Sequence, residues 1–198
     1  MKPIIGIIYR NSLSETNKKI NIIYEDINKC IINSGGIPIG ISNKYIDNYF
    51  NICDGFILQG GNDIEPINLE IINKIREKNI PLLGICLGMQ EIGICYNGVD
   101  IDIDNHLDTY HDIIIDKYSL LYKIVNSDKI KVNSRHKSSI INSNLYVSSK
   151  SLDNINESYE DRDKLFLLGL QWHPENMYDN DVNSRKIFDY FVKICNDN

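Results

Sequence analysis

Short apolar runs alternate with longer amphipathic segments through the first half of the chain. The run at residues 3–9 predicts a buried strand, and residues 15–33 carry isoleucines at helical spacing, which predicts a helix. Ser12 and Glu15 are spaced as a capping box for that helix, and Ser34-Gly35-Gly36 ends it. The pattern then predicts strands at 37–41, 54–58 and 81–85, and helices at about 43–51, 68–78 and 87–97. Alternating apolar strands and helices favour a parallel sheet covered on both faces.

After residue 110 the pattern changes to short strand-like runs followed by one helix. The predicted strands are 111–115, 129–133, 145–150 and 165–172, and the helix is 182–195. The polar stretch 153–164 predicts a hairpin loop. The chain shows no internal repeat, low-complexity tract or linker. We therefore expect residues 1–198 to form a single α/β domain, with a central, mostly parallel sheet flanked by helices and a small antiparallel extension.

Composition narrows the class of protein. Of the 198 residues, 42% are hydrophobic and 24% are charged, which is ordinary for a globular domain. The net charge of −6 argues against a general nucleic-acid or membrane-surface binder, and the tyrosines are not interleaved with a basic patch. No apolar run is long enough to span a membrane, and the N-terminal run is too short for a signal peptide. We therefore expect a cytoplasmic protein with no nucleic-acid or membrane partner.

The strongest chemical signal is Gly84-Ile85-Cys86-Leu87-Gly88, which follows an apolar strand and precedes a predicted helix. This is the form of a nucleophile elbow, with cysteine as the nucleophile. Small flanking residues are needed because the turn is sharp and holds the nucleophile in strained backbone geometry. A thiol at a helix N-terminus is favoured as thiolate. The other four cysteines, which form no C-x-x-C motif, are expected to be inert buried residues.

A second signal is Gln171-Trp172-His173-Pro174-Glu175, directly after another apolar strand. Residues two apart on extended backbone point to the same side, and Pro174 favours extended geometry at His173. Glu175 can therefore accept a hydrogen bond from one ring nitrogen of His173, which leaves the other nitrogen to act as a base for Cys86. On its own, the same pair would fit a strand-end histidine with a chance acidic neighbour.

A third signal is the turn Gln59-Gly60-Gly61-Asn62-Asp63, which ends the strand predicted at 54–58. Backbone N–H groups of Gly60 or Gly61, together with that of Leu87, would form an oxyanion hole. A simple left-handed turn explains the two glycines equally well. Neither a G-x-G-x-x-G nor a Walker A motif is present, so a nucleotide-binding turn is excluded.

Together with Pro3-Ile4-Ile5-Gly6-Ile7, Gly36-Ile37-Pro38 and Val132-Asn133-Ser134-Arg135-His136, these segments resemble class I glutamine amidotransferases. More narrowly, they resemble stand-alone γ-glutamyl-γ-aminobutyrate hydrolases. The resemblance implies a flavodoxin-like architecture and a Cys86–His173–Glu175 triad that forms a γ-glutamyl thioester. It also implies that Gln90 and the segment carrying Asn133, Ser134 and His136 hold the glutamyl amino and carboxylate groups. No cofactor is implied.

The sequence departs from the hydrolase pattern at positions that affect which amine is released and whether a partner protein is needed. Only fourteen residues separate Pro66 from Pro81, Leu87 stands where the hydrolases carry Arg, and Lys137-Ser138 replaces His-Gln. The main hypothesis is a hydrolase that releases glutamate and an amine from a γ-glutamyl amide. The alternative is a glutaminase subunit that supplies ammonia to a separate synthase. A non-catalytic, chaperone-like relative and a metal-dependent amidase are less well supported, and the residues do not fix the oligomeric state.

His106 and His111 are candidate metal ligands by residue type. Their spacing across Asp108 fits no zinc pattern, so we expect His111 to be structural or to lie at the rim of the pocket and predict no metal site. Asp100, Asp102 and Asp104 alternate with isoleucines and predict the solvated face of a short strand.

Overall fold

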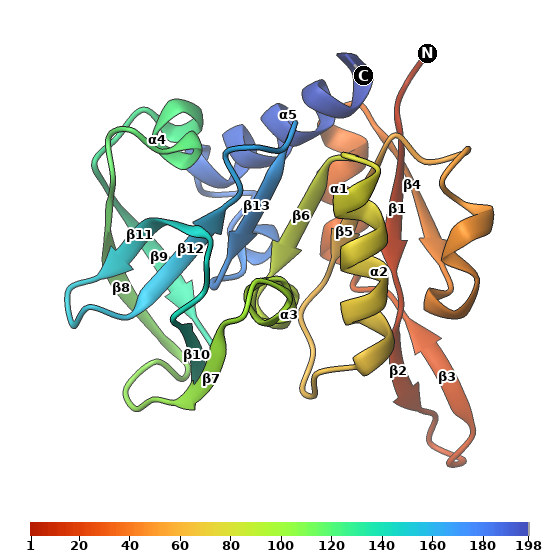
Figure 1. Cartoon of the computed structure of the whole chain (residues 1–198), viewed down its shortest axis with the longest axis horizontal. Coiled ribbons are helices and arrows are strands. Elements are labelled where there is room, and N and C mark those ends of the chain that lie inside the picture. Colours follow the sequence, from red (N-terminus) through yellow and green to blue (C-terminus); the bar gives the residue numbers. More distant parts are fainter. Residues whose placement is uncertain (198) are drawn as a thin grey trace.

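The computed structural model describes residues 1–197 and contains a nine-stranded mixed sheet at its centre (Figure 1). The strands, in their order across the sheet, are β4 (Ile37–Ile41), β1 (Ile4–Ile8), β5 (Gly55–Leu58), β6 (Leu82–Ile85), β13 (Leu167–Leu170), β12 (Asn156–Glu160), β11 (Tyr146–Ser151), β8 (Thr109–Ile115) and β9 (Lys129–Ser134). The half from β4 to β13 is parallel, and the half from β12 to β9 is antiparallel. The predicted fold class is confirmed, although the antiparallel part contains four strands.

Helices cover both faces of the sheet, because both faces are apolar. One face packs against α2 (Pro66–Glu77), α3 (Leu87–Cys95) and the 3-10 segment η1 (Asn43–Asn48). The other face packs against α1 (Glu25–Asn33), α4 (Leu120–Val125) and α5 (Val182–Asp197). The sheet therefore separates two hydrophobic cores. Within residues 1–197, no helix has both the length and the apolar character needed to cross a lipid bilayer.

The carboxyl ends of the parallel strands β5, β6 and β13 lie at one edge of the sheet, which is the lower edge in Figure 1. The chain leaves β6 at this edge and enters α3, so residue 86 stands at the junction. The segment that follows β13 leads into the short helix η2 (Pro174–Asn176). Because β6 and β13 are neighbours in the sheet, the two predicted catalytic segments end side by side.

The helix predicted at 15–33 is wrong in its first half. Residues 10–22 form a hairpin of β2 (Arg10–Leu13) and β3 (Lys19–Ile22), and only Glu25–Asn33 are helical. Ser12 and Glu15 therefore form no capping box. The segment Lys19-Ile20-Asn21-Ile22 alternates polar and β-branched residues, and Asn17 supplies a positive φ of 58° at the turn. A period-2 pattern with β-branched residues favours a strand over a helix.

The loop predicted at 153–164 is also wrong, because β12 runs through it. This strand lies inside the sheet, and Glu157, Ser158 and Glu160 are all buried. The partners come from neighbouring strands: Ser158 bonds Ser149, Glu160 accepts from Ser148, and Oε1 of Glu157 lies 3.1 Å from Nε2 of His111. Polar residues are tolerated in a buried strand when their hydrogen bonds are satisfied, and a hydropathy pattern does not show this. The small pair β7 (Val99–Asp102) and β10 (Ser138–Ile141) completes the fold, with Asp100 and Asp102 exposed as predicted.

Candidate active site

Cys86 stands at a strained turn between β6 and α3. Its backbone has φ 51° and ψ −108°, a region that residues with a side chain seldom adopt. The turn brings α3 so close to β5 that a Cβ at Gly88 would collide with the carbonyl oxygen of Leu58. A Cβ at Gly84 would lie 2.8 Å from the Gly88 backbone. The two glycines are thus required by close backbone contact, and the segment has the local geometry of a nucleophile elbow.

His173 and Glu175 are held together as the sequence predicts. The Nδ1 atom of His173 lies 2.7 Å from Oε1 of Glu175, whose side chain is almost fully buried. Asn133 fixes the backbone of His173 from β9: its amide donates to the carbonyl of His173 at 3.0 Å and accepts from the N–H of His173 at 2.8 Å. The ring is therefore positioned at both its backbone and its Nδ1 side.

The ring of His173 faces Cys86. Both side chains lie against Gly60. A Cβ atom placed on this glycine would be 2.9 Å from Cε1 of His173 and 3.7 Å from Cβ of Cys86. Burial by itself would lower the pKa of His173, but hydrogen bonds with Cys86 and Glu175 raise it to about 10. An imidazolium is thus favoured at neutral pH beside the sulfur of Cys86.

The other thiols are in surroundings of a different kind. Burial raises the pKa of Cys53 to about 12 and that of Cys95 to about 11. Burial also raises the pKa of Cys30 and Cys195. These four cysteines remain protonated at neutral pH, which agrees with their predicted role as inert residues.

The Gly60–Gly61 turn is fixed by a buried ion pair that the sequence analysis did not identify. Arg10 donates to the carbonyls of Gln59 (Nη2, 2.6 Å) and Gly60 (Nε, 3.2 Å). Its guanidinium also binds Glu91 through two bonds of 2.8 Å. In a trans peptide the N–H points opposite to the C=O, so the N–H groups of Gly60 and Gly61 face away from Arg10. Because the chain bends at this turn, Gly61 also comes next to Leu87, the residue after the nucleophile.

The residues predicted to hold the glutamyl group have different positions. Gln90 donates to the carbonyl of Ser138 and to Oε1 of Gln171, and Gln171 in turn places Nε2 3.9 Å from Sγ of Cys86. Gln171 is thus an additional site residue, and its place two residues before His173 was the available signal. The hydroxyl of Ser134 is buried and donates to the carbonyl of His106, so it serves the structure.

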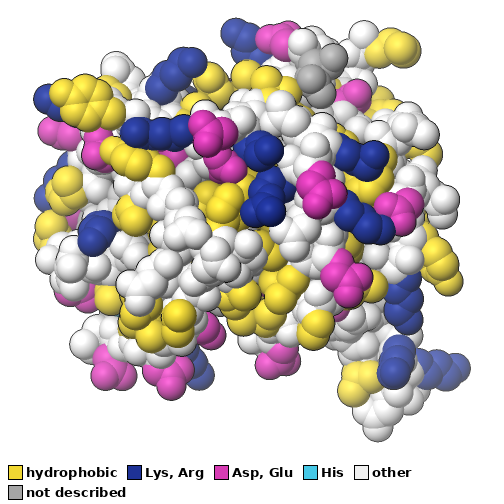
Figure 2. All heavy atoms as spheres, viewed as in Figure 1, with side chains coloured by type: hydrophobic (Ala, Val, Ile, Leu, Met, Phe, Trp, Pro, Cys, Tyr) yellow, Lys and Arg dark blue, Asp and Glu magenta, His cyan; other side chains and the backbone are white. Residues whose placement is uncertain are grey.

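His136 does not face the nucleophile. Its Nε2 atom lies 3.2 Å from Nδ1 of His106, its Nδ1 atom lies 2.9 Å from the carbonyl of Ser138, and the residue is 4% exposed. The substrate-holding role predicted for it is therefore not supported by its position. His111 likewise packs against His106 and Glu157 on the antiparallel half of the sheet. No histidine side chain is visible on the face of the molecule shown in Figure 2.

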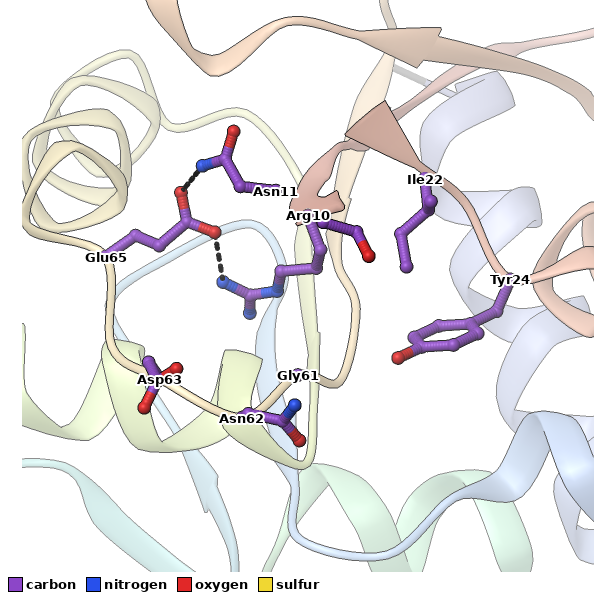
Figure 3. Close-up of a pocket in the computed structure, with 9 residues that line it drawn as sticks. Arg10, Asn11, Ile22, Tyr24, Gly61, Asn62, Asp63 and Glu65 are labelled. Carbon is purple, nitrogen blue, oxygen red and sulfur yellow. Dashed lines mark hydrogen bonds and ion pairs between the residues drawn. The ribbon is translucent and has the colours of Figure 1, made fainter. Parts of the chain in front are cut away.

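An open pocket of about 330 Å³ adjoins the Gly60–Gly61 turn (Figure 3). The β2–β3 hairpin and Tyr24 form one side, and residues 61–65 form the other, with Asp63 and Glu65 among them. Glu65 accepts hydrogen bonds from Asn11 and Asn43. Cys86 and His173 do not line this pocket, so it is a neighbour of the reacting atoms and not the place where they meet.

Fold and sequence together place the chain in a known family. The Peptidase C26 family model matches residues 3–70 and 67–175, and the chain belongs to this family. It is 26% identical to the protein NtpR of Enterococcus hirae, covering 98% of this chain and 99% of the relative. It is 24% identical to the γ-glutamyl-γ-aminobutyrate hydrolase PuuD of Escherichia coli, covering 98% and 93%. These alignments span 241 and 239 residues, so both relatives carry insertions that this shorter chain lacks.

Solved structures show the same fold. The CTPS glutaminase domain of Trypanosoma brucei with bound acivicin matches with a TM-score of 0.75 at 17% identity, covering 96% of this chain and 94% of that one. A glutamine amidotransferase of Thermotoga maritima matches with a TM-score of 0.69 at 14% identity, covering 100% and 97%. The architecture is therefore that of the class I glutamine amidotransferases, as the sequence resemblance implied.

Proposed function

We propose that this protein is a cysteine-dependent hydrolase of γ-glutamyl amides. The observation that carries the proposal is the contact between Cys86, at its positive-φ turn, and a histidine whose Nδ1 lies 2.7 Å from a buried carboxylate. This is the nucleophile–base–orienter arrangement of acyl-transfer enzymes. Membership of the Peptidase C26 family and the similarity to a γ-glutamyl-γ-aminobutyrate hydrolase support this choice of substrate class.

The proposed reaction has two stages. In the first, the sulfur of Cys86 attacks the γ-carbonyl carbon, and the oxyanion is stabilised by N–H groups of Leu87 and of the Gly60–Gly61 turn. His173, which carries the proton, gives it to the leaving nitrogen as the C–N bond breaks, and a γ-glutamyl thioester remains. In the second stage, His173 takes a proton from water, the hydroxide displaces the sulfur, and glutamate leaves. Glu175 orients His173 throughout.

The pocket beside Gly61 is the proposed place for the departing amine. It adjoins Gly61 and carries the carboxylates of Asp63 and Glu65. The interval between Pro66 and Pro81 contains little more than α2, so it supplies no additional segment to cover the pocket. We propose that the pocket admits an amine larger than γ-aminobutyrate.

A γ-glutamyl amide panel with enzymatic detection of glutamate tests the proposal. Cys86→Ala is expected to reduce glutamate release by at least about 10⁴-fold, because removing a nucleophile leaves only binding and oxyanion stabilisation. Cys95→Ala, the same replacement nine residues further along the chain, at the end of α3 and outside the site, should retain activity. Glutamate release that persists in Cys86→Ala would overturn the mechanism.

The second candidate is a glutaminase subunit that passes ammonia to a synthase. The open side of the pocket favours this candidate, because a partner protein could complete it. Leu87 also favours it, since it replaces the Arg expected of a hydrolase. The two candidates differ in what the isolated chain does. A hydrolase turns over γ-glutamyl amides alone, whereas a glutaminase subunit stays nearly inactive on glutamine until its synthase is added.

A further inference from the structure

Four ionisable side chains from distant parts of the chain meet on the antiparallel half of the sheet, away from Cys86. Three ring nitrogens surround one carboxylate oxygen, Oε1 of Glu157. Nε2 of His111 lies 3.1 Å from it, Nδ1 of His106 lies 3.3 Å from it, and Nε2 of His136 lies 3.7 Å from it. Glu157 is fully buried on β12, and His106 and His136 are 3% and 4% exposed.

The outer nitrogens of two rings are already held by acceptors. Nε2 of His106 lies 3.0 Å from a carboxylate oxygen of Asp153, and Nδ1 of His136 lies 2.9 Å from the carbonyl oxygen of Ser138. These acceptors require N–H groups, so in neutral rings the lone pairs are on the inner nitrogens. The two inner nitrogens are 3.2 Å apart and face Glu157. Lone pairs and a carboxylate directed at one another repel unless a proton or a metal cation lies between them.

The carboxylate itself gives independent evidence of a missing partner. Oε2 of Glu157 is inaccessible to solvent and has no hydrogen-bond partner within the described part of the chain. Glu157 and Asp153 together bring two carboxylates to the three imidazoles, and a divalent cation balances that charge. Outer acceptors that fix the tautomer of ligating histidines are the usual support of zinc sites.

We propose that His106, His111, His136 and Glu157 bind one divalent metal ion of the zinc class. Ligands 2.0–2.1 Å from a tetrahedral zinc are separated by roughly 3.3 Å, and the four ligand separations given above lie between 3.1 and 3.7 Å. The ligating atoms of His106, His111 and Glu157 all lie within 4.8 Å of one another. Neutral imidazole and carboxylate are ligands that zinc accepts.

A route to the site is present. A pocket of about 360 Å³ opens beside His106 and His136, and its walls include Asp102 and Asp104. These exposed carboxylates would raise the local concentration of cations at the entrance. The spacing of His106 and His111 fits no zinc motif because the other two ligands come from different segments, and this explains why the sequence analysis predicted no metal.

The expected role of the ion is structural. It would join the β7–β8 loop, β8, the β9–β10 loop and β12, and it does not touch Cys86. One link to the active site is present, since the carbonyl of Ser138 accepts hydrogen bonds from both His136 and Gln90. Metal binding would thereby stabilise the position of Gln90.

Direct metal binding by the purified full chain tests the proposal. The wild-type protein, saturated with Zn²⁺ and desalted, is expected to retain about one equivalent by mass spectrometry. Co²⁺ in its place should give the visible absorption of a tetrahedral site without a thiolate charge-transfer band. His111→Gln and Glu157→Gln should each lose the ion, and Asp153→Asn, which removes only the charge of an outer acceptor, should weaken binding by about 10- to 100-fold.

His173→Gln is the matched control, because it makes the same replacement in the candidate active site and should leave the zinc content unchanged. If Glu157→Gln fails to fold, His111→Gln carries the test, because the ring of His111 is at the edge of the cluster and 19% exposed. A folded wild-type chain that retains no zinc, or retention of zinc by both ligand variants, would overturn the proposal. None of these measurements uses activity, so they are independent of the hydrolase function.

Discussion

At the scale of single residues, Arg10 shows how a buried charge can fix the conformation of the Gly60–Gly61 turn. Its guanidinium is 4% exposed and makes a two-bond pair with Glu91, so the charge is neutralised inside the protein. The same group donates to two carbonyls of the Gln59–Gly60 segment. The planar, five-donor shape of Arg allows all these bonds at once, and Lys cannot reproduce them.

Replacement of Arg10 by Lys is therefore expected to lower kcat more than it raises KM. The proposed N–H donors stabilise charge that exists only in the transition state, and loss of one such donor costs about 10²- to 10³-fold. Because Arg10 acts through the turn, we expect a smaller fall of about 10- to 100-fold, measured by steady-state kinetics on a γ-glutamyl amide. Arg162→Lys, on the exposed surface, is the control. An unchanged kcat in Arg10→Lys would show that the turn does not need the guanidinium.

The raised pKa of His173 makes the stability of the protein depend on pH. The folded pKa of about 10 is above the ordinary value of 6.5, so the folded state holds this proton more tightly than the unfolded chain. The resulting stabilisation is fully present below pH 6.5 and is lost as the pH rises through about 10. Denaturant unfolding of wild type and His173→Gln should show a stability difference that shrinks over this range. A difference that is constant or grows with pH would contradict the Cys86–His173–Glu175 network.

The sequence could predict that Cys86, His173 and Glu175 lie together, because local backbone geometry restricts the residues around them. The elbow glycines and Pro174 leave a readable signature within a few positions. No such local signature marks Arg10 and Glu91. They are 81 positions apart in the sequence, and they pair only after β1 and α3 have packed on β5. The one available hint was a lone acidic residue in the apolar segment Leu87–Cys95, which needs a buried partner.

At the scale of elements, the close packing of α3 against β5 requires a residue without a side chain at position 88. Gly88 lies against the backbone of Leu58, and backbone cannot yield as a flexible side chain can. The close approach places the first turn of α3, with Leu87, next to the Gly60–Gly61 turn that ends the same strand. The position of the helix and the geometry of the candidate oxyanion hole are therefore set by the same contact.

Gly88→Ala is expected to destabilise the protein by about 1–3 kcal/mol or more, because α3 must move away from β5. Gly35→Ala is the control. A Cβ at Gly35 meets no atom within 4 Å, so this replacement costs only the strain of its positive φ, about 1 kcal/mol. Thermal or denaturant unfolding of both variants gives the comparison. Equal losses would show that the helix adjusts to a side chain at residue 88.

Two elements were predicted incorrectly for different reasons. Over so short a window, the isoleucines of residues 15–24 fit both helical spacing and strand alternation. The segment forms a hairpin because Asn17 adopts the positive φ that the turn requires. In β12 the burial of Glu157 and Ser158 depends on partners from β8 and β11, which the segment itself does not contain. Such long-range hydrogen bonding is not visible in a local pattern.

At the scale of the whole molecule, both halves of the central sheet contribute residues to the candidate active site. The parallel half supplies Cys86 and leads into His173, and the antiparallel half supplies Asn133, which fixes the backbone of His173. The fold class was predictable because strand and helix periodicities are repeated along the chain. In the antiparallel half β8, β9 and β11 were predictable in the same way, whereas β12 was not, because its polar residues resemble a loop.

The raised pKa of four thiols, and the position of the fifth beside His173, have a practical outcome for handling the protein. An electrophile shaped like a γ-glutamyl group should attach once per molecule, at Cys86, and leave Cys30, Cys53, Cys95 and Cys195 unmodified. The fraction of molecules that gain the mass of a single adduct would then count the competent molecules in any preparation, before a natural substrate has been identified.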